Sequence, residues 1–290
     1  MSPLAWHHVD VFSPRPYSGN SLAVCADARH LSDVQMLAIA RELRHFESIF
    51  LAPSTDSRSW RARIFDLAGE LDFAGHPLLG AAAVLHALHR EAGRAEWRFT
   101  LNAKAVPVTT MRTAGGYTAL LDQGRPEFLG ELPAGRRGEL VAALGLEASD
   151  AAADVPLQVV STGLRYLILP ITQGLERARI VRRDFDALLA SIGAQYVYVL
   201  DVNALEGRHW NNDGLLEDVA TGSAAGTVGA YAVRHGLVDP GQEFILRQGR
   251  FAGRPSEMRV TCEGSRAHIE RVLVGGDVAP VGSGTLEVLP

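Results

Sequence analysis

The 290-residue sequence predicts an α+β fold in which two pseudo-symmetric halves each form a β-barrel-like sheet wrapped around a central helix. Two features of the chain favour this arrangement. Many short β-rich runs are separated by turn residues, and two helical segments, residues 77–92 and 223–234, have almost no polar face. A helix without a polar face must be covered on all sides, so the simplest packing wraps the strands around it.

An internal repeat is the third feature that predicts two similar halves. Residues 69–77 and 215–226 both contain an acidic residue, small residues, a glycine, a polar side chain and then a helix of small residues. The two motifs match in three pairs when they are aligned on their glycines: Gly75 with Gly222, Glu70 with Glu217, and His76 with Ser223.

The length of the chain agrees with two lobes of about 140 residues, because single cores stop growing near 250–300 residues. We expect a first lobe at residues 1–121, containing Glu47 and His76, and a second lobe at residues 122–290, containing Asp218 and Ser223. An alternative is that the C-terminal strand returns to the first lobe.

In the first half, strands alternate with two predicted helices. A helix is expected from an N-cap at Ser32 to about Arg44, because apolar residues recur there at helical spacing. A second helix is bounded by Pro77, at a first helical position, and by Gly93 just past the last turn. The strands of this half are predicted at residues 8–12, 21–25, 46–51, 60–66, 98–110 and 117–121.

The second half repeats this inventory. Helices are predicted near residues 137–144, around an amphipathic segment from Phe185 to Ile192, and at residues 223–234, where Gly236 ends the helix. The strands are predicted at residues 157–160, 165–170, 196–200, 244–248, 258–262 and 268–274.

Bulk composition excludes several classes of function. A hydrophobic fraction of 47% with 21% charged residues describes a soluble globular protein. A net charge of −5 argues against a nucleic-acid partner, which needs clustered Lys and Arg. Because no signal-like N-terminus and no apolar run of about 18 residues occur, we expect a cytoplasmic enzyme without a membrane partner.

The sequence contains no pattern that suggests a metal or nucleotide site. Cys25 and Cys262 lie in strand-like segments without CxxC spacing, so they are interpreted as inert buried thiols. No His, Cys and carboxylate cluster has metal-ligand spacing. The glycine-rich residues 221–226 lack the lysine and spacing of a P-loop, so no nucleotide cofactor is expected.

Gly75 and Gly222 immediately precede the two small-residue helices. The first N–H groups of a helix have no intrahelical partner and attract anions. If the pseudo-twofold symmetry of the two halves brings both helix starts to one cleft, the positive electrostatic field there suits a small carboxylate substrate. The alternative is ordinary capping, for which Ser223 is a good N-cap residue.

Glu47 is the strongest candidate for a catalytic residue. It lies on an apolar strand, on the same face as Ile49 and Leu51, where a carboxylate is partly desolvated and acquires the raised pKa of a general acid/base. The alternative is an edge strand with Glu47 facing water. Glu217 and Asp218 point opposite ways in an extended segment, so one of them is expected to face the cleft.

Asp218, Ser223 and His76 together also suggest a serine hydrolase, which remains an alternative hypothesis. The sequence lacks the G-x-S-x-G elbow of one large hydrolase class, and a triad depends on a geometry that the sequence does not contain. His76 at a helix start can instead bind substrate or serve as a capping residue.

Several short motifs spread along the chain carry a resemblance to a known family: residues 10–12, 19–20, 39–42, 47, 73–77, 217–226, 248–249 and 253–256. They resemble the phenazine-biosynthesis PhzF-like isomerase family, and the match runs nearly end to end. The resemblance implies the diaminopimelate-epimerase-like fold of two barrels around central helices. It also implies a homodimer and a role in phenazine or other antibiotic biosynthesis.

By this resemblance, Glu47 moves a proton between two carbons of trans-2,3-dihydro-3-hydroxyanthranilate, and no cofactor is required. The implied partner is therefore a small carboxylic acid. The implied catalytic residues are Glu47, Asp218 and His76. The implied substrate-binding residues are Ser223, Gly75, Gly222, Asn20 and Thr221.

The sequence also departs from related patterns. The related epimerases use two opposed cysteines, whose places are taken here by Ala74 and Thr221, so racemisation by two thiols is excluded. Beside the predicted site, the family's usual residues are replaced at Ser21, at residues 44–46 and at Val219. These changes leave two further hypotheses: an isomerase of another precursor, such as an unsaturated alkylproline intermediate, or a non-catalytic small-molecule binding protein.

Overall fold

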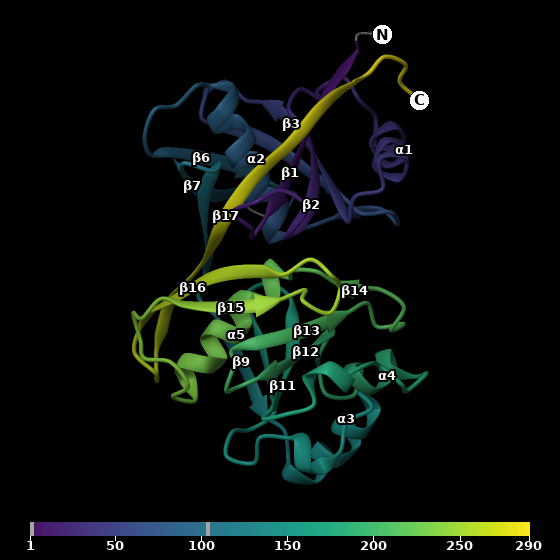
Figure 1. Cartoon of the computed structure of the whole chain (residues 1–290), viewed down its shortest axis with the longest axis vertical. Coiled ribbons are helices and arrows are strands. Elements are labelled where there is room, and N and C mark those ends of the chain that lie inside the picture. Colours follow the sequence, from purple (N-terminus) through teal and green to yellow (C-terminus); the bar gives the residue numbers. More distant parts are fainter. Residues whose placement is uncertain (1–2, 103–104) are drawn as a thin grey trace. The chain divides into compact units, whose positions relative to one another are not determined.

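The computed structural model describes residues 3–102 and 105–290 of the chain (Figure 1). The chain forms two units, one made of Met1–Asp122 with Gly275–Pro290 and the other of Gln123–Val274. Two strands, β8 (Tyr117–Gly124) and β17 (Ile269–Leu286), pass from one unit into the other.

The first unit is a closed barrel of strands. Each strand pairs with the next one, and β17 pairs with both β8 and β1, which closes the ring. Besides β8 and β17, its members are β1 (Leu4–Val11), β2 (Asn20–Cys25), β3 (Glu47–Pro53), β4 (Ser59–Phe65), β6 (Ala95–Thr100) and β7 (Ala105–Arg112). A two-residue strand, β5 (Glu70–Leu71), pairs with β4 outside this ring.

Helix α2 (Gly75–Leu88) lies inside the barrel of the first unit, where it contacts β1, β2, β3, β6 and β7 (Figure 1). Its residues are buried from Gly75 to His86. Gly80 is necessary for this close packing, because a Cβ there would stand 2.4 Å from the Leu22 side chain. The prediction of a helix covered on all sides is confirmed.

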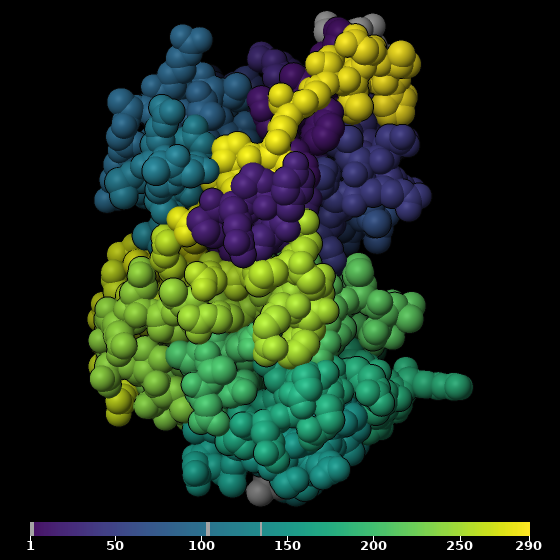
Figure 2. Space-filling view, viewed as in Figure 1, coloured from purple at the N-terminus to yellow at the C-terminus, as the bar shows by residue number. Residues whose placement is uncertain are grey.

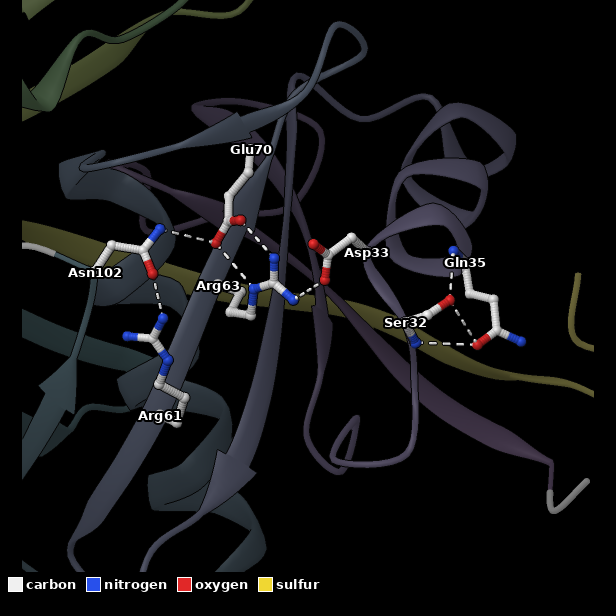
Figure 3. Close-up of polar contacts among 7 residues, drawn as sticks. All are labelled: Ser32, Asp33, Gln35, Arg61, Arg63, Glu70 and Asn102. Atoms are coloured by element: carbon white, nitrogen blue, oxygen red, sulfur yellow. Dashed lines mark hydrogen bonds and ion pairs between the residues drawn. The ribbon is translucent and has the colours of Figure 1, made fainter.

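Helix α1 (Asp33–Leu43) covers the outside of this barrel, with Met36 and Ile39 in a cluster that includes Phe50 and Phe65. Ser32 is the N-cap of the helix, as the sequence predicted, and the structure adds a capping box with Gln35. The Ser32 amide donates to the Gln35 side chain at 3.0 Å, and the Gln35 amide donates to the Ser32 hydroxyl at 3.4 Å (Figure 3).

The second unit wraps its strands around α5 (Gly222–Arg234), which contacts β10, β11 and β16. The strands are β9 (Glu127–Glu131), β10 (Gln158–Ser161), β11 (Arg165–Ile171), β12 (Tyr196–Asp201), β13 (Glu206–Trp210), β14 (Glu217–Asp218), β15 (Phe244–Gln248) and β16 (Ser256–Gly264). The outer helices are α3 (Arg137–Ala143) and α4 (Phe185–Ala190), with short 3₁₀ turns at η1 (Ala134–Arg136), η2 (Ala148–Asp150) and η3 (Leu175–Arg177).

The two units share one pattern of strand pairing. In the first, β2 and β3 are parallel, β3 and β4 antiparallel, and β4 and β6 parallel. In the second, β11 and β12 are parallel, β12 and β13 antiparallel, and β13 and β15 parallel. The short strands β5 and β14 occupy equivalent places before their central helices. The predicted α+β fold with two pseudo-symmetric halves is therefore confirmed.

Several predicted boundaries are wrong. Helix α2 begins at Gly75 and α5 at Gly222, so both glycines are the first helical residues, and Pro77 is the third residue of its helix. Helix α2 ends at Leu88 rather than Ala92, because Arg90 has a left-handed backbone with φ of 54°. The predicted strand at residues 98–110 is two antiparallel strands, β6 and β7, and its residues 103–104 lie outside the described residues.

The sequence prediction missed β9 and β13. These strands read Glu-Phe-Leu-Gly-Glu and Glu-Gly-Arg-His-Trp, and the glycine and charged residues hide the alternation that identifies a strand. In β13, Arg208 and His209 are buried because they have specific polar partners within the second unit.

The C-terminal segment forms part of the first unit. Leu4 of β1 is opposite Leu286 of β17, and Figure 2 shows the last residues in yellow beside the first ones in purple on one face. Cys25 and Cys262 are buried, and burial raises the pKa of each thiol to about 12. The prediction that both thiols are buried is confirmed.

Within residues 3–102 and 105–290, no helix has the length and apolar character needed to cross a bilayer. The same described residues contain no group of three or more His, Cys, Asp or Glu side chains arranged to hold a metal ion.

Candidate functional site

Glu47 and His76 meet in the first unit. The Glu47 Oε2 atom lies 3.1 Å from His76 Nε2, and the two side chains are 12% and 5% exposed. In the part of the chain that the structure describes, neither atom has a hydrogen-bond partner. The carboxylate and the imidazole are therefore in close contact without hydrogen-bond alignment, and both atoms are buried.

The fold brings this pair together at the start of the central helix. Glu47 is the first residue of β3 and lies opposite Leu22 of β2, whose side chain packs against α2. His76 is the second residue of α2, and no described side chain caps that helix, because its N-cap residue is Ala74. The positive end of the helix dipole favours a carboxylate at this place.

The strand residues around Glu47 are apolar. Leu22, Ile49 and Ile64 have no exposed surface, and Ile64 is opposite Leu71 of β5. Asn20, predicted to bind substrate, is also buried, at the first position of β2 and two residues before Leu22. The Glu47 carboxylate is thus partly desolvated, and the alternative of a water-facing edge strand is wrong.

In the second unit, Asp218 belongs to a buried network of hydrogen bonds. Its carboxylate accepts from the Thr221 hydroxyl at 2.6 Å, and its backbone carbonyl accepts from the Gln248 side chain at 2.8 Å. Gln248 also donates to the Thr221 hydroxyl at 2.9 Å, while its oxygen accepts from the Thr221 amide and from the Tyr198 phenol. This network orders the residues that lead into α5.

Glu217, next to Asp218, has a different partner. The Arg208 guanidinium forms two hydrogen bonds to the Glu217 carboxylate, at 2.9 and 2.6 Å. Arg208 also donates to three backbone carbonyls and lies against the rings of Trp210 and Phe251. Of the two acidic residues, Glu217 therefore serves an internal ion pair, whereas Asp218 lies in the network before the helix.

Ser223 is the second residue of α5 and is not its N-cap residue. The N-cap is Thr221, and no described side chain forms a capping bond there, so the capping interpretation of Ser223 is wrong. The Ser223 hydroxyl is instead 2.8 Å from the phenol of Tyr166 on β11. A phenol in this position, rather than an imidazole, also weakens the hydrolase hypothesis.

Tyr166 packs in a cluster of rings. Its ring centroid lies 5.4 Å from that of Tyr196 and 5.5 Å from that of His209. The Nδ1 atom of His209 donates to the Val197 carbonyl at 2.8 Å. Burial lowers the pKa of His209, although the nearby Asp218 carboxylate opposes that shift. The ring planes of His209 and Tyr166 meet edge to face, at 72°.

The structure brings the predicted residues together in two groups. Glu47, His76 and Gly75 gather in the first unit, and Asp218, Thr221, Gly222 and Ser223 gather in the second. Sequence reasoning missed the partners that orient the second group, namely Tyr166, Gln248 and His209. Gln248 belongs to a motif that was singled out, but the bonds of its side chain depend on tertiary structure.

Comparison with known proteins identifies the family. The model of the phenazine biosynthesis-like family, PhzC-PhzF, matches residues 9–284. The chain belongs to this family. The match covers both units and both groups of site residues.

Three similar proteins illustrate the relationship. The trans-2,3-dihydro-3-hydroxyanthranilate isomerase of Pseudomonas fluorescens is 32% identical, over 96% of this chain and 97% of the relative. A structure described as a predicted epimerase from Pseudomonas aeruginosa is 47% identical, with a TM-score of 0.92 over 98% of this chain and 99% of that one. A hydroxyproline epimerase from Agrobacterium vitis, 16% identical over 99% of this chain and 93% of that one, has a TM-score of 0.65 and so shares the fold.

These findings confirm the resemblance that the sequence motifs indicated. The fold is diaminopimelate-epimerase-like, and the protein is an isomerase of the PhzF type.

Proposed function

We propose that the protein moves a proton within a small conjugated amino or hydroxy carboxylic acid by acid/base catalysis with one carboxylate. The observation that carries this proposal is the buried Glu47–His76 pair at the uncapped start of α2. The proposed substrate resembles trans-2,3-dihydro-3-hydroxyanthranilate, on which several relatives about 32% identical act according to their names.

In the proposed reaction, the Glu47 carboxylate removes a proton from one carbon, and the electron pair of that C–H bond enters the conjugated system. The resulting carboxylic acid returns a proton to a different carbon. No atom or electron is gained or lost, so the chemistry requires no cofactor. A largely buried carboxylate suits this role, because it can be held within reach of the proton that it transfers.

His76 is proposed to assist Glu47. Its Nε2 atom is close enough to stabilise the charge of the carboxylate or that of the substrate. Asp218 is proposed to hold the substrate amino group, and the start of α5 with Ser223 to hold the carboxylate. Thr221, Gly222, Gly75 and Asn20 are proposed to complete the substrate-binding set, with Thr221 orienting Asp218.

Turnover in deuterated water tests the reaction. Purified protein incubated with trans-2,3-dihydro-3-hydroxyanthranilate should form an isomer that carries deuterium at the carbon receiving the proton. Glu47→Gln keeps the shape of the side chain but cannot exchange a proton, so kcat should fall about 10³-fold. Glu70→Gln, a matched carboxylate change in the same unit, should retain turnover. Wild-type turnover by Glu47→Gln would contradict the proposal.

A related substrate is the second candidate, and one contact favours it. Ser21 and His45, two places where the sequence departs from the family pattern, contact one another, with 2.6 Å between Ser21 Oγ and His45 Nδ1. Ser21 Oγ is also 2.9 Å from His8 Nε2. His45 is two residues before Glu47, so this contact changes the residues next to the proposed catalytic carboxylate. We propose that the change suits a different conjugated acid, such as an unsaturated alkylproline intermediate.

A panel of conjugated amino and imino acids separates the candidates. Faster turnover of an alkylproline intermediate than of dihydrohydroxyanthranilate would favour the second candidate. Ligand binding without turnover of any acid, unchanged in Glu47→Gln, would favour a non-catalytic binding protein. The proposed homodimer, in the cytoplasm, is tested by sedimentation and by fractionation of the producing cells.

A further inference from the structure

Tyr166 is a buried residue of the second unit that lies outside the family motifs, and its side chain contacts that of Ser223, a proposed substrate-binding residue. It is the second residue of β11, it is 2% exposed, and its phenol lies 2.8 Å from Ser223 Oγ. The Ser223 side chain is only partly buried, so its hydroxyl is able to meet both Tyr166 and a ligand.

The chemistry of the two hydroxyls sets the direction of the bond between them. Each hydroxyl has one hydrogen to donate and two lone pairs that accept. A phenol is more acidic than an alcohol, so Tyr166 is the better donor and Ser223 the better acceptor. When Tyr166 donates to Ser223 Oγ, the hydrogen of Ser223 is left to point elsewhere.

An anion is the partner that suits this remaining hydrogen. Ser223 is the second residue of α5, where no described side chain caps the helix. The unpaired amides of a first helical turn attract a carboxylate, and a hydroxyl that donates to the same anion adds a charge-assisted hydrogen bond. A hydroxyl donating in the opposite direction would present a lone pair to the anion and repel it.

The surroundings hold the Tyr166 ring in one orientation. Tyr196 and His209 pack against it at 5.4 and 5.5 Å between centroids, and His209 itself is fixed by its bond to the Val197 carbonyl. A donor that is already held in position loses little conformational entropy when the ligand binds, so its hydrogen bond strengthens the binding of the ligand.

We propose that Tyr166 is a positioning residue, which donates to Ser223 Oγ and thereby makes the Ser223 hydroxyl a donor to the carboxylate of the substrate. This inference rests on the proposed function only in assigning Ser223 to a carboxylate. It adds a residue, and a direction of hydrogen bonding, to that site.

A double-mutant cycle tests the inference with Tyr166→Phe, Ser223→Ala and the double variant. A hydrogen bond made equally to the bound substrate and to the transition state contributes to binding only, so each change should raise KM and leave kcat within about twofold. We expect an increase in KM of about fivefold for Tyr166→Phe and about tenfold for Ser223→Ala, within the range for one lost hydrogen bond. The double variant should match Ser223→Ala, because Tyr166 acts through Ser223.

Tyr231→Phe is the matched control. Tyr231 is also fully buried in the second unit, but its phenol donates to the Pro156 carbonyl at 2.7 Å. It should lose stability similarly in thermal denaturation while KM stays at the wild-type value. A rise in KM equal to that of Tyr166→Phe would show a merely structural effect and overturn the inference.

Binding of anthranilate, measured by calorimetry, keeps the test independent of turnover. If wild-type protein binds this amino carboxylic acid without isomerising dihydrohydroxyanthranilate, the proposed reaction fails, and the affinities of the four proteins of the cycle still judge the role of Tyr166. If wild-type protein turns over substrate but the losses in the cycle are additive, the role of Tyr166 fails and the reaction stands. Absence of both binding and turnover overturns both proposals.

Discussion

The two units have the same strand pairing, but many equivalent positions hold apolar side chains in the first unit and polar ones in the second. The registers of β2 to β6 and of β11 to β15 can be matched residue by residue. The first unit has Leu22, Ile49, Ile64, Leu71, Ala74 and Leu101 where the second has Tyr166, Tyr198, His209, Asp218, Thr221 and Gln248. Glu47 and His76 correspond to Tyr196 and Ser223.

The two units therefore offer different chemistry on the same pattern of strand pairing. In the first unit, Glu47 and His76 lie near the apolar side chains of Leu22, Ile49 and Ile64, which suits proton transfer. The second unit builds a hydrogen-bonded network from hydroxyl, amide, imidazole and carboxylate groups, which suits the orientation of a polar ligand. One feature is kept in both units, an arginine paired with the glutamate of the repeated motif.

That conserved ion pair gives the largest expected contrast in stability. Arg63 bonds to Glu70 and Asp33 near solvent (Figure 3), whereas Arg208 bonds to Glu217 and three backbone carbonyls. Arg208→Met leaves a buried carboxylate and carbonyls unpaired, so it should lower the free energy of unfolding by about 3–5 kcal/mol.

Arg63→Met is the control for this change, because solvent screens its partners and the loss should stay within about 1 kcal/mol. Urea denaturation of both variants makes the comparison. Equal losses would show that the two ion pairs are equivalent in energy as well as in position.

The next effect concerns catalysis by the first unit. His76→Ala removes the group beside Glu47, so kcat should fall about 10²-fold with a small change in KM. His76→Gln keeps a polar atom near the place of Nε2 and should recover part of the rate. If His76→Ala changes KM alone, His76 binds substrate as Ser223 does, and the division of roles between the units is wrong.

Gln248 offers a smaller effect that is confined to the second unit. Gln248→Met removes the side chain that joins Asp218, Thr221 and Tyr198, leaving buried polar groups unpaired at a cost of about 1–3 kcal/mol. The equivalent Leu101→Met in the first unit conserves apolar character and should cost less than about 1.5 kcal/mol. Denaturation midpoints and the KM of each variant test whether the network orders the substrate-binding residues.

The dependence of stability on pH gives the smallest effect. Burial lowers the pKa of His209 below its ordinary value of 6.5 in the folded protein. Below pH 6.5, His209 therefore takes up a proton more readily in the unfolded chain than in the folded one. Its contribution to the free energy of unfolding is fully present above this pH and is lost as the pH falls. His209→Asn, which can keep a donor to the Val197 carbonyl, should flatten this dependence between pH 7 and 5. An unchanged slope would exclude His209 as a source of it.

Much of the fold followed from the sequence because its strongest signals are local. Two helices without a polar face required strands around them, and Ser32 is the predicted N-cap of α1. The strands that were missed, β9 and β13, are polar, and the partners that allow Arg208 and His209 to be buried are distant in sequence.

The candidate site was predictable to the extent that its residues stand in motifs. Glu47 was identified by a charge within an apolar run, and its burial agrees with that reasoning. Tyr166 was not identified, since a tyrosine in a buried strand is indistinguishable from any core aromatic residue until Ser223 is placed beside it. Matching Tyr166 with Leu22 through the repeat would have marked the position as unusual.

The N-terminal half of the chain does not contain the whole first unit, because this unit also needs part of strand β17. A fragment of residues 1–122 ends before the strand that pairs with both β1 and β8, so expression of it alone leaves two open sheet edges. Such a fragment should aggregate. Appending residues 275–290 through a short linker should prevent aggregation, because these residues supply the missing strand between β1 and β8. A single cut of the chain therefore separates neither unit intact from the other.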